Sequence, residues 1–389
     1  MKTKLTFKFV FVIFCLFMYS GVYASTNETY TVTAGNLGTL LGPKSATITT
    51  LVLSGQINGA DIDILRKMPL LSALDIKNVQ IVAGGTFSAE NTQIPVYANR
   101  LPNAMFHKMT GLKSVTIPIS VTDIGDHAFY GCTGLTSIKI PDKVTRIGSL
   151  AFHDCTGVTT IEIGSSLDSI GLAAFCGSLK LKNFIVSTSN TKLSAIDGVL
   201  MKGNRLIRFP NKFSTSYTIP KSVTIIEGHA FCGCTDLVNI HIPTNVKTIG
   251  VDAFYGCTKL AEVHCGSTLP PNLFSESFYN INKEVCKLFV PVGAITNYRA
   301  NLDWNKFVTI LEEQLLGVPD LTLNDLNIYT DQNEIVISGA PFGETISVYN
   351  LFGAMIHKMK VTDEVVRINV PANQIYLVKV AKKTSKVSL

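Results

Sequence analysis

Residues 112–134 read LKSVTIPISVTDIGDHAFYGCTG, and residues 135–157 read LTSIKIPDKVTRIGSLAFHDCTG. The two stretches are copies of one 23-residue unit, and further copies lie on both sides of them. A repeat of this length predicts a stack of short coils, each burying its apolar face against the next. We therefore predict a repeat solenoid that is mainly β. Phenylalanine keeps the same step through the chain, at Phe106, Phe129, Phe152, Phe175, Phe231 and Phe254.

Each unit has a strand, a turn and a return leg. Ile138 and Ile140 alternate with polar residues, which predicts a half-buried strand. Pro141 has no N–H to continue a ladder, so the strand ends there. Ile147 points inward on the return leg, and Gly148 fits a tight bend in which a side chain would clash.

The pattern L-x-x-I-x-I-P-x-x-V-x-x-I-G-x-x-A-F-x-G-C resembles the BspA type of leucine-rich repeat, over roughly residues 46 to 313. The resemblance implies a secreted or surface-attached bacterial protein. Some members of that family bind host matrix proteins or other cells.

The first 24 residues have the pattern of a signal peptide. A basic start is followed by an apolar run from Phe9 to Met18, and Val22 to Ala24 offers small residues for cleavage. The run is too short to span a bilayer, and no later stretch is long and apolar enough to do so. A lipid anchor on Cys15 is an alternative that Phe14 disfavours, because a small residue is wanted there.

The mature chain divides by its patterns into an N-terminal lead, a solenoid and a C-terminal domain. We expect a lead at 25–45, then the solenoid at 46–316, with atypical capping units at both ends and an insertion near 187–216. Within the first cap, residues 60–68 predict a short helix, whereas residues 81–100 indicate a loop. In the insertion, Asp197-Gly198 between apolar runs favours a β-hairpin. The last cap resembles the family's closing segment, a strand followed by a short helix, and Trp304 is expected to seal the end.

A linker near residues 316–320 is expected to precede a domain at 321–389, where six or seven short apolar runs separated by turn residues predict a small β-sandwich. The phrases at 346–353 and 375–380 resemble the sorting domain of the type IX secretion system. The match lacks the usual Asn-Pro near the first strand and has Gln374 where glycine is usual. The resemblance implies export to the outer surface of a Gram-negative bacterium.

Eight of the nine cysteines follow residue 24. Four of them share one repeat position, held by Met109 and Ser178 in other units, and we expect them to be reduced and buried. Disulfides between neighbouring coils are the alternative in an oxidising compartment. Outside this row, Cys265 and Cys286 are the best candidates for a disulfide. Zinc is disfavoured, because C-x-C at residues 232–234 lacks the usual spacing. The four shared positions are Cys132, Cys155, Cys234 and Cys257.

Polar residues at equivalent strand positions form two rows on one face, which is the usual place where a solenoid binds partners. A metal site made by His241, His264 and Glu262 is an alternative to a solvated face. The candidate ligand face consists of Thr116, Lys139, Glu162, His241 and His264 in one row, and Ser114, Ser137, Thr160, Asn239 and Glu262 in the other.

Motifs and charge narrow the function. The sequence contains no G-x-S-x-G elbow, no H-E-x-x-H and no P-loop, so we expect neither an enzyme nor a cofactor. The net charge is +6, and three of the lysines fall within the first 24 residues, which leaves no basic stripe for a nucleic acid. We therefore expect a protein that binds a host or neighbouring-cell protein or glycan. A structural protein of the cell envelope or biofilm is the alternative.

Overall fold

The structure is a computed structural model that describes residues 26–313, 327–331, 334–340, 342–350, 354–363, 365–371, 374–380 and 383–388. The chain forms two compact units, Met1–Glu312 and Glu313–Leu389. The expected signal peptide at 1–24 and the expected linker near 316–320 lie outside the described residues.

The N-terminal cap is a parallel sheet flanked by helices. Residues 25–45, expected as a separate lead, contain β1 and α1, and β1 pairs in parallel with β2. The helix expected at 60–68 is confirmed as α2, whose Asn58 and Asp61 form a capping box. The elements are β1 (Asn27–Val32), α1 (Leu37–Leu41), the 3-10 helix η1 (Gly42–Ala46), β2 (Thr50–Ile57), α2 (Gly59–Lys67) and β3 (Ala73–Ile81).

The interpretation of residues 81–100 as a loop was wrong, since they contain an antiparallel hairpin of β4 (Thr86–Ala89) and β5 (Thr92–Pro95). Glu90 and Asn91 both have positive φ, the geometry of a two-residue hairpin turn. Phe87 is buried, whereas the alternate residues of β4 are exposed, so the hairpin adds one apolar face to the core.

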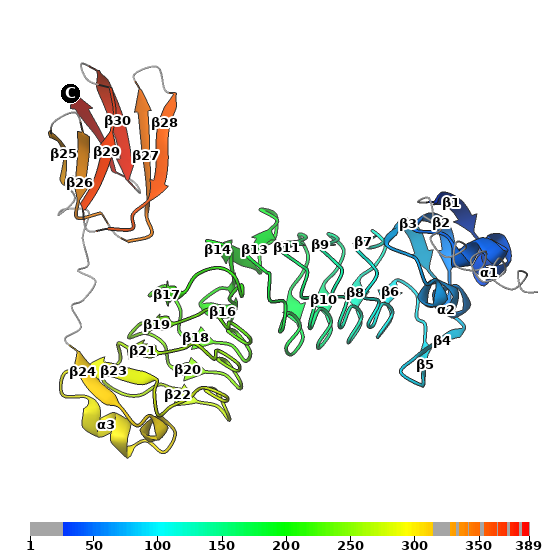
Figure 1. Cartoon of the computed structure of the whole chain (residues 1–389), viewed down its shortest axis with the longest axis horizontal. Coiled ribbons are helices and arrows are strands. Elements are labelled where there is room, and N and C mark those ends of the chain that lie inside the picture. The colour runs from blue at the N-terminus through cyan, green and yellow to red at the C-terminus, as the bar shows by residue number, and fades with distance from the viewer. Residues whose placement is uncertain are drawn as a thin grey trace, which may run out of the picture. The chain divides into compact units, whose positions relative to one another are not determined.

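The regular coils stack with a constant step of 23 residues. Ile138 lies beside Ile161 in one sheet, and Ile147 lies beside Ile170 in the other. One face, which we call the strand face, therefore carries the longer strands, and the opposite side carries the short return strands (Figure 1). On the strand face lie β7 (Ser114–Thr116), β9 (Ser137–Ile140), β11 (Thr160–Ile163) and β13 (Asn183–Val186); the return strands are β6 (Arg100–Leu101), β8 (Asp123–Ile124), β10 (Arg146–Ile147) and β12 (Ser169–Ile170).

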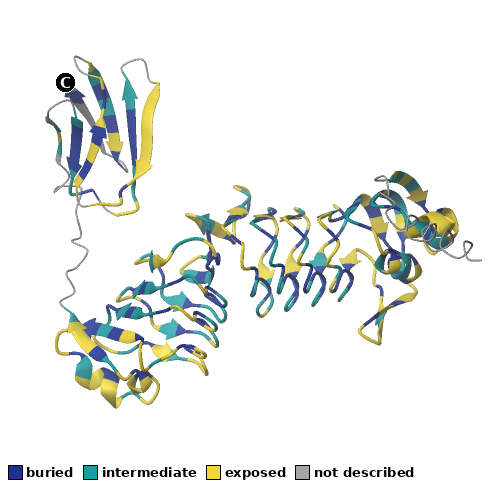
Figure 2. Ribbon diagram, in the orientation of Figure 1, coloured by how far each residue is buried: buried dark blue, intermediate teal, exposed yellow. Residues whose placement is uncertain are grey.

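A column of phenylalanine rings fills the space between the two sheets, where Figure 2 shows the buried residues. Phe129 stacks on Phe152 with ring centroids 5.0 Å apart, and Phe152 stacks on Phe175 at 5.6 Å. A second column runs from Phe209 through Phe231 and Phe254 to Phe278 at 4.8–5.0 Å steps. The predicted solenoid is confirmed, and the repeated phenylalanines occupy equivalent buried positions.

The expected insertion hairpin is also confirmed. β14 (Ser194–Ile196) and β15 (Val199–Lys202) pair antiparallel, and β16 (Arg205–Arg208) follows beside β15. Because side chains alternate along a strand, neighbouring residues of β15 face different cores. Leu200 belongs to the first hydrophobic cluster and Val199 to the second, so β15 separates the two.

After the insertion, β16 pairs in parallel with the next return strand and the coils resume. The last coil closes with a strand and a short helix, as expected. Trp304 is fully buried and its indole Nε1 donates to the carbonyl of Pro271 at 2.8 Å. The elements are β17 (Ser216–Thr218), β18 (Ile225–Ile226), β19 (Asn239–Ile242), β20 (Thr248–Ile249), β21 (Glu262–Cys265), β22 (Asn272–Leu273), β23 (Lys287–Pro291), α3 (Ile295–Ala300), η2 (Trp304–Lys306) and β24 (Ile310–Glu313).

The shared cysteine position is a buried column of free thiols, as predicted. The thiol of Cys132 donates to the carbonyl of Phe106 at 2.9 Å, and that of Cys155 donates to the carbonyl of Phe129 at 3.2 Å. Ser178 makes the same contact with the carbonyl of Phe152. Burial raises the pKa of Cys132 to about 12, so this thiol stays protonated and unreactive at neutral pH.

The C-terminal unit has seven strands in two sheets that share one core, which forms the expected β-sandwich. Every described residue of β28, at the edge of its sheet, is exposed (Figure 2). No helix in the described residues has the length and apolar content needed to cross a membrane. The strands are β25 (Asn327–Asp331), β26 (Glu334–Ser338) and β29 (Val365–Asn369) in one sheet, and β28 (Met355–Lys360), β27 (Thr345–Asn350), β30 (Ile375–Val380) and β31 (Lys383–Ser388) in the other.

Candidate functional site

The ten residues of the candidate ligand face all lie on strands of the strand face, in two groups. Lys139 lies opposite Glu162, and the Nζ of Lys139 is 3.5 Å from a carboxylate oxygen of Glu162. Both side chains are exposed, so the pair contributes little to stability and is available to a partner. Ser137 and Thr160 lie opposite each other in the next row, whereas Thr116 and Ser114 pair with the N-terminal cap.

The second group is less solvated than the sequence suggested. His241 lies opposite His264 with ring centroids 4.2 Å apart, and His264 stacks on Phe289 at 4.5 Å. In the adjacent row Asn239 lies opposite Glu262. The insertion separates this group from Lys139 and Glu162 along the chain, so the structure brings each group together but interrupts the rows between them.

The proposed metal alternative gains no support from the geometry. Glu262 lies 3.5 Å from the Nε2 of His264. Across the described residues, no three His, Cys, Asp or Glu side chains converge as metal ligands would. Stacked imidazole rings face each other and do not aim their nitrogens at one common point.

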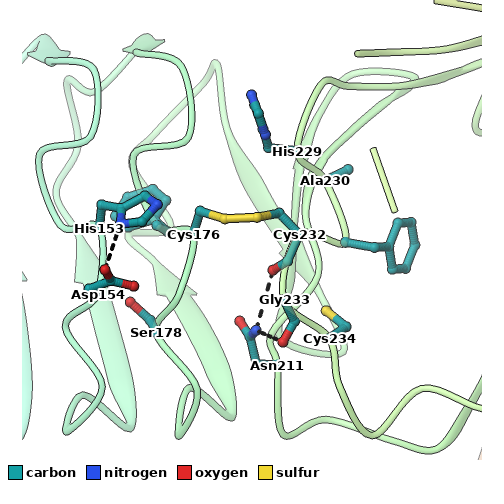
Figure 3. The surroundings of a disulfide bond; sticks show 12 residues. His153, Asp154, Cys176, Ser178, Asn211, His229, Ala230, Cys232, Gly233 and Cys234 are labelled. Atoms are coloured by element: carbon teal, nitrogen blue, oxygen red, sulfur yellow. Dashed lines mark hydrogen bonds and ion pairs between the residues drawn. A yellow bond between two sulfur atoms is a disulfide. The ribbon is translucent and has the colours of Figure 1, made fainter. Parts of the chain in front are cut away.

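A disulfide joins the coils on either side of the insertion (Figure 3). Cys176 and Cys232 are bonded, with Cα atoms 5.6 Å apart and 56 residues between them in sequence. Each cysteine directly follows a core phenylalanine, Phe175 or Phe231, so the two occupy the same repeat position.

The pairing expected for Cys265 and Cys286 was wrong, since both are free and buried. Glu262 lies opposite Lys287 in the β21–β23 register, so Cys286 is level with Ala261 and four residues from Cys265 along the strands. Four strand residues span about 13 Å, well beyond the reach of a disulfide.

Between the bridged coils lies a shortened coil, residues 205–211. It places Phe209 in the phenylalanine column and its amide donates to the carbonyl of Ala230, as in other coils. Intact coils have four residues between the return strand and the phenylalanine, for example 148–151. The shortened coil has only two, Ile207 and Arg208. Its turn therefore reaches less far outward than its neighbours.

Arg208 is almost fully buried and bonds to the main chain of both bridged coils. Its guanidinium donates to the carbonyls of Phe175, His229, Ala230 and Cys232. The side chain of Asn211 adds bonds to the carbonyls of Cys232 and Gly233 (Figure 3). These side chains satisfy carbonyls that the shortened turn does not reach, because a buried carbonyl without a donor is costly.

The short turn leaves a cleft of about 700 Å³, which we call the junction cleft. Glu227 lines it at a repeat position that is glycine elsewhere. At Gly148 an added Cβ would lie 2.5 Å from the amide nitrogen of Asp126 in the preceding coil. The shortened turn removes that obstacle, so Glu227 is tolerated. The lining consists of residues 168–176, Leu193, Lys202, Arg205, Ile207, Arg208 and residues 227–229.

The charges of the junction cleft are mixed and mostly paired. Lys202 bonds to the carboxylate of Asp168 at 2.7 Å, and Arg205 pairs with Glu227. Burial lowers the pKa of His229 below its usual value, with Asp252 opposing the shift, so the imidazole is neutral at pH 7.

A smaller pocket of about 330 Å³ lies on the disulfide and shares Leu172, Ala173 and Cys176 with the junction cleft. Rings of His153 and Tyr255 line it. Burial lowers the pKa of His153, with Asp154 opposing the shift. Both cysteines here are bonded to each other, so neither offers a thiol nucleophile. The geometry is that of a binding site.

Sequence reasoning missed the junction cleft, although two signals marked it. Glu227 stands where glycine is needed, and Leu206 to Phe209 is two residues short of the repeat spacing. The matched position of Cys176 and Cys232 was the third clue, hidden by the 56-residue interval.

Comparison with solved structures finds other leucine-rich repeat proteins. One is a leucine-rich cell surface protein of Faecalibacterium prausnitzii A2-165, with 19% identity over 74% of this chain and 88% of that chain, and a TM-score of 0.40. Another is a leucine-rich repeat protein of Eubacterium ventriosum, with 19% identity over 73% of this chain and 80% of that chain, and a TM-score of 0.41. The chain is also similar to a leucine-rich repeat protein of T. pallidum, with 22% identity over 60% and 78% of the two chains and a TM-score of 0.29.

No curated protein matches the chain significantly. The family model for the BspA type leucine rich repeat region matches six copies, at residues 84–196 and 208–297. The interval between the two matches falls within the insertion, and together they cover just over half of the chain. The chain therefore belongs to the family of proteins with BspA-type leucine-rich repeats.

Proposed function

We propose that this protein is a secreted or cell-surface binding protein whose strand face contacts a protein or glycan on a host or neighbouring cell. The observation that carries the proposal is the in-register, exposed pair of Lys139 and Glu162, continued in the later coils by His241 and His264. Aligned strands hold these side chains without mobile loops, so little conformational entropy is lost on binding. The family often occurs at cell surfaces, and the solenoid is typically a non-enzymatic binding scaffold.

Loss of the exposed pair is expected to weaken binding to the partner at least about tenfold, because contacts at the centre of an interface carry most of its energy. The test compares Lys139→Ala/Glu162→Ala with the full mature chain on immobilised matrix proteins and glycans. The matched control is Asp236→Ala/Lys259→Ala, which removes another surface pair between adjacent coils, 3.0 Å apart. Equal binding by both variants would show that the strand face is not the site.

We further propose that the C-terminal unit is a type IX sorting domain, which places the protein on the outer surface of a Gram-negative bacterium. The two phrases that carry the resemblance lie on adjacent antiparallel strands, since Ile346 lies opposite Val380 and Val348 opposite Val378. Removal of residues 321–389 is expected to abolish surface display in a host that has this secretion system. Undiminished display of the truncated chain, measured by whole-cell antibody binding, would contradict the proposal.

A further inference from the structure

The junction cleft exposes main-chain donors that have lost their acceptors. In the preceding coil the amide of Leu150 donates to the carbonyl of Leu172 at 2.9 Å, and the amide of Phe152 donates to that of Ala174 at 2.8 Å. The equivalent amides of the next coil belong to Ala173 and Phe175. Neither has an acceptor among the described residues, because the shortened coil places no carbonyl beside them.

A third donor lines the same cleft. The Nε of Arg208 has no partner among the described residues, although the side chain is only 4% exposed and its other nitrogens are bonded. A buried donor without an acceptor is costly, so the cleft has a standing preference for a group that supplies oxygens.

The spacing of these donors selects main-chain carbonyls. Ala173 and Phe175 are two residues apart, as are Leu172 and Ala174, whose carbonyls accept the corresponding bonds one coil earlier. An extended chain presents carbonyls to one side at every second residue. Beside the cleft, β12 is the edge of its sheet and pairs only with β10 in the described residues. Peptides commonly bind by adding to such an edge.

The charges favour a peptide over a polyanion. Lys202 and Arg205 already pair with Asp168 and Glu227, and a polyanionic ligand would meet both carboxylates. A peptide main chain is neutral, and Leu172 and Ile207 offer apolar contact for its side chains. The volume of about 700 Å³ lies within the range of ordinary ligand pockets.

We propose that the junction cleft binds a short extended peptide segment, whose carbonyls accept from the amides of Ala173 and Phe175 and occupy the space left by the shortened turn. This site is separate from the strand face. It gives the solenoid a second recognition surface at the place where its repeat is broken.

The test uses the fluorescein-labelled, acetylated and amidated hexapeptide IGDHAF, which copies residues 124–129 and so carries the carbonyls of an intact turn. Fluorescence anisotropy with the full mature chain is expected to show saturable binding below about 1 mM. Bound peptide is also expected to slow amide hydrogen exchange in residues 170–177. The all-D peptide is the matched control, because it has the same chemistry and the wrong hand.

Two variants obstruct the cleft. Glu227→Trp and Leu172→Trp are each expected to raise the Kd at least about tenfold. Glu227→Gly restores the residue of the other coils and is expected to retain binding. Lys139→Ala/Glu162→Ala also keeps peptide binding, so failure on the strand face and failure here are distinguishable. Equal binding of the L and D peptides, unchanged affinity in both tryptophan variants, or preference for a short oligogalacturonate would each overturn the proposal.

Discussion

Replacement of both Cys176 and Cys232 by serine is expected to lower the free energy of unfolding by about 4 kcal/mol, since the bond closes a 56-residue loop and removes that freedom from the unfolded chain. The loop contains the whole insertion, including β15, which separates the two hydrophobic clusters. Urea denaturation of the mature chain, with and without reductant, measures the effect.

Reductant supplies the internal control for this prediction. It is expected to shift the urea midpoint of the native protein but leave that of the Cys176→Ser/Cys232→Ser variant unchanged, because the other described cysteines are already free thiols. Identical midpoints for the oxidised and reduced native protein would show that the bond does not stabilise the junction.

The repeat could be predicted from sequence because one spacing carries both the local and the long-range information. Phe129 and Phe152 are one step apart in sequence and one coil apart in space, so a count along the chain is also a map of neighbours. Asp197-Gly198 was equally informative, since few residues other than glycine and asparagine favour the positive φ of that turn.

The N-terminal cap escaped prediction because its elements follow no repeat. β1 is a short polar strand with alternating exposure, and it is ordered by pairing with β2 rather than by its own composition. The hairpin of β4 and β5 has only one residue, Phe87, among the largest fully buried side chains. Strand propensity depends on such context more than helix propensity does.

The junction cleft could not be located because its position depends on where the chain returns after the insertion. Spacing alone left Cys176 and Cys232 56 residues apart, whereas the fold makes their coils neighbours. The same limit explains the wrong pairing of Cys265 with Cys286, since only the register of β21 and β23 reveals their offset. A departure from the repeat, such as Glu227 for glycine, is therefore the signal most worth following in this architecture.

Phe152→Ala is expected to lower the free energy of unfolding by about 4 kcal/mol, the loss typical of a large aromatic removed from a packed core. Phe152 is fully buried and its ring stacks on both neighbours, Phe129 and Phe175. The coils on either side cannot close the cavity, because their backbones are fixed by hydrogen bonds from Phe129 to Ala151 and from Phe152 to Ala174. Chemical denaturation measures the change.

Leu172→Ala is the matched control, since Leu172 lies in the next coil but is 63% exposed. Its replacement is expected to change stability by less than about 0.5 kcal/mol. Phe152→Leu fills most of the cavity and is expected to fall between the two. If Phe152→Ala were no more costly than Leu172→Ala, the column of rings would not be the element that holds the coils together, and stability would have to arise from the main-chain ladders alone.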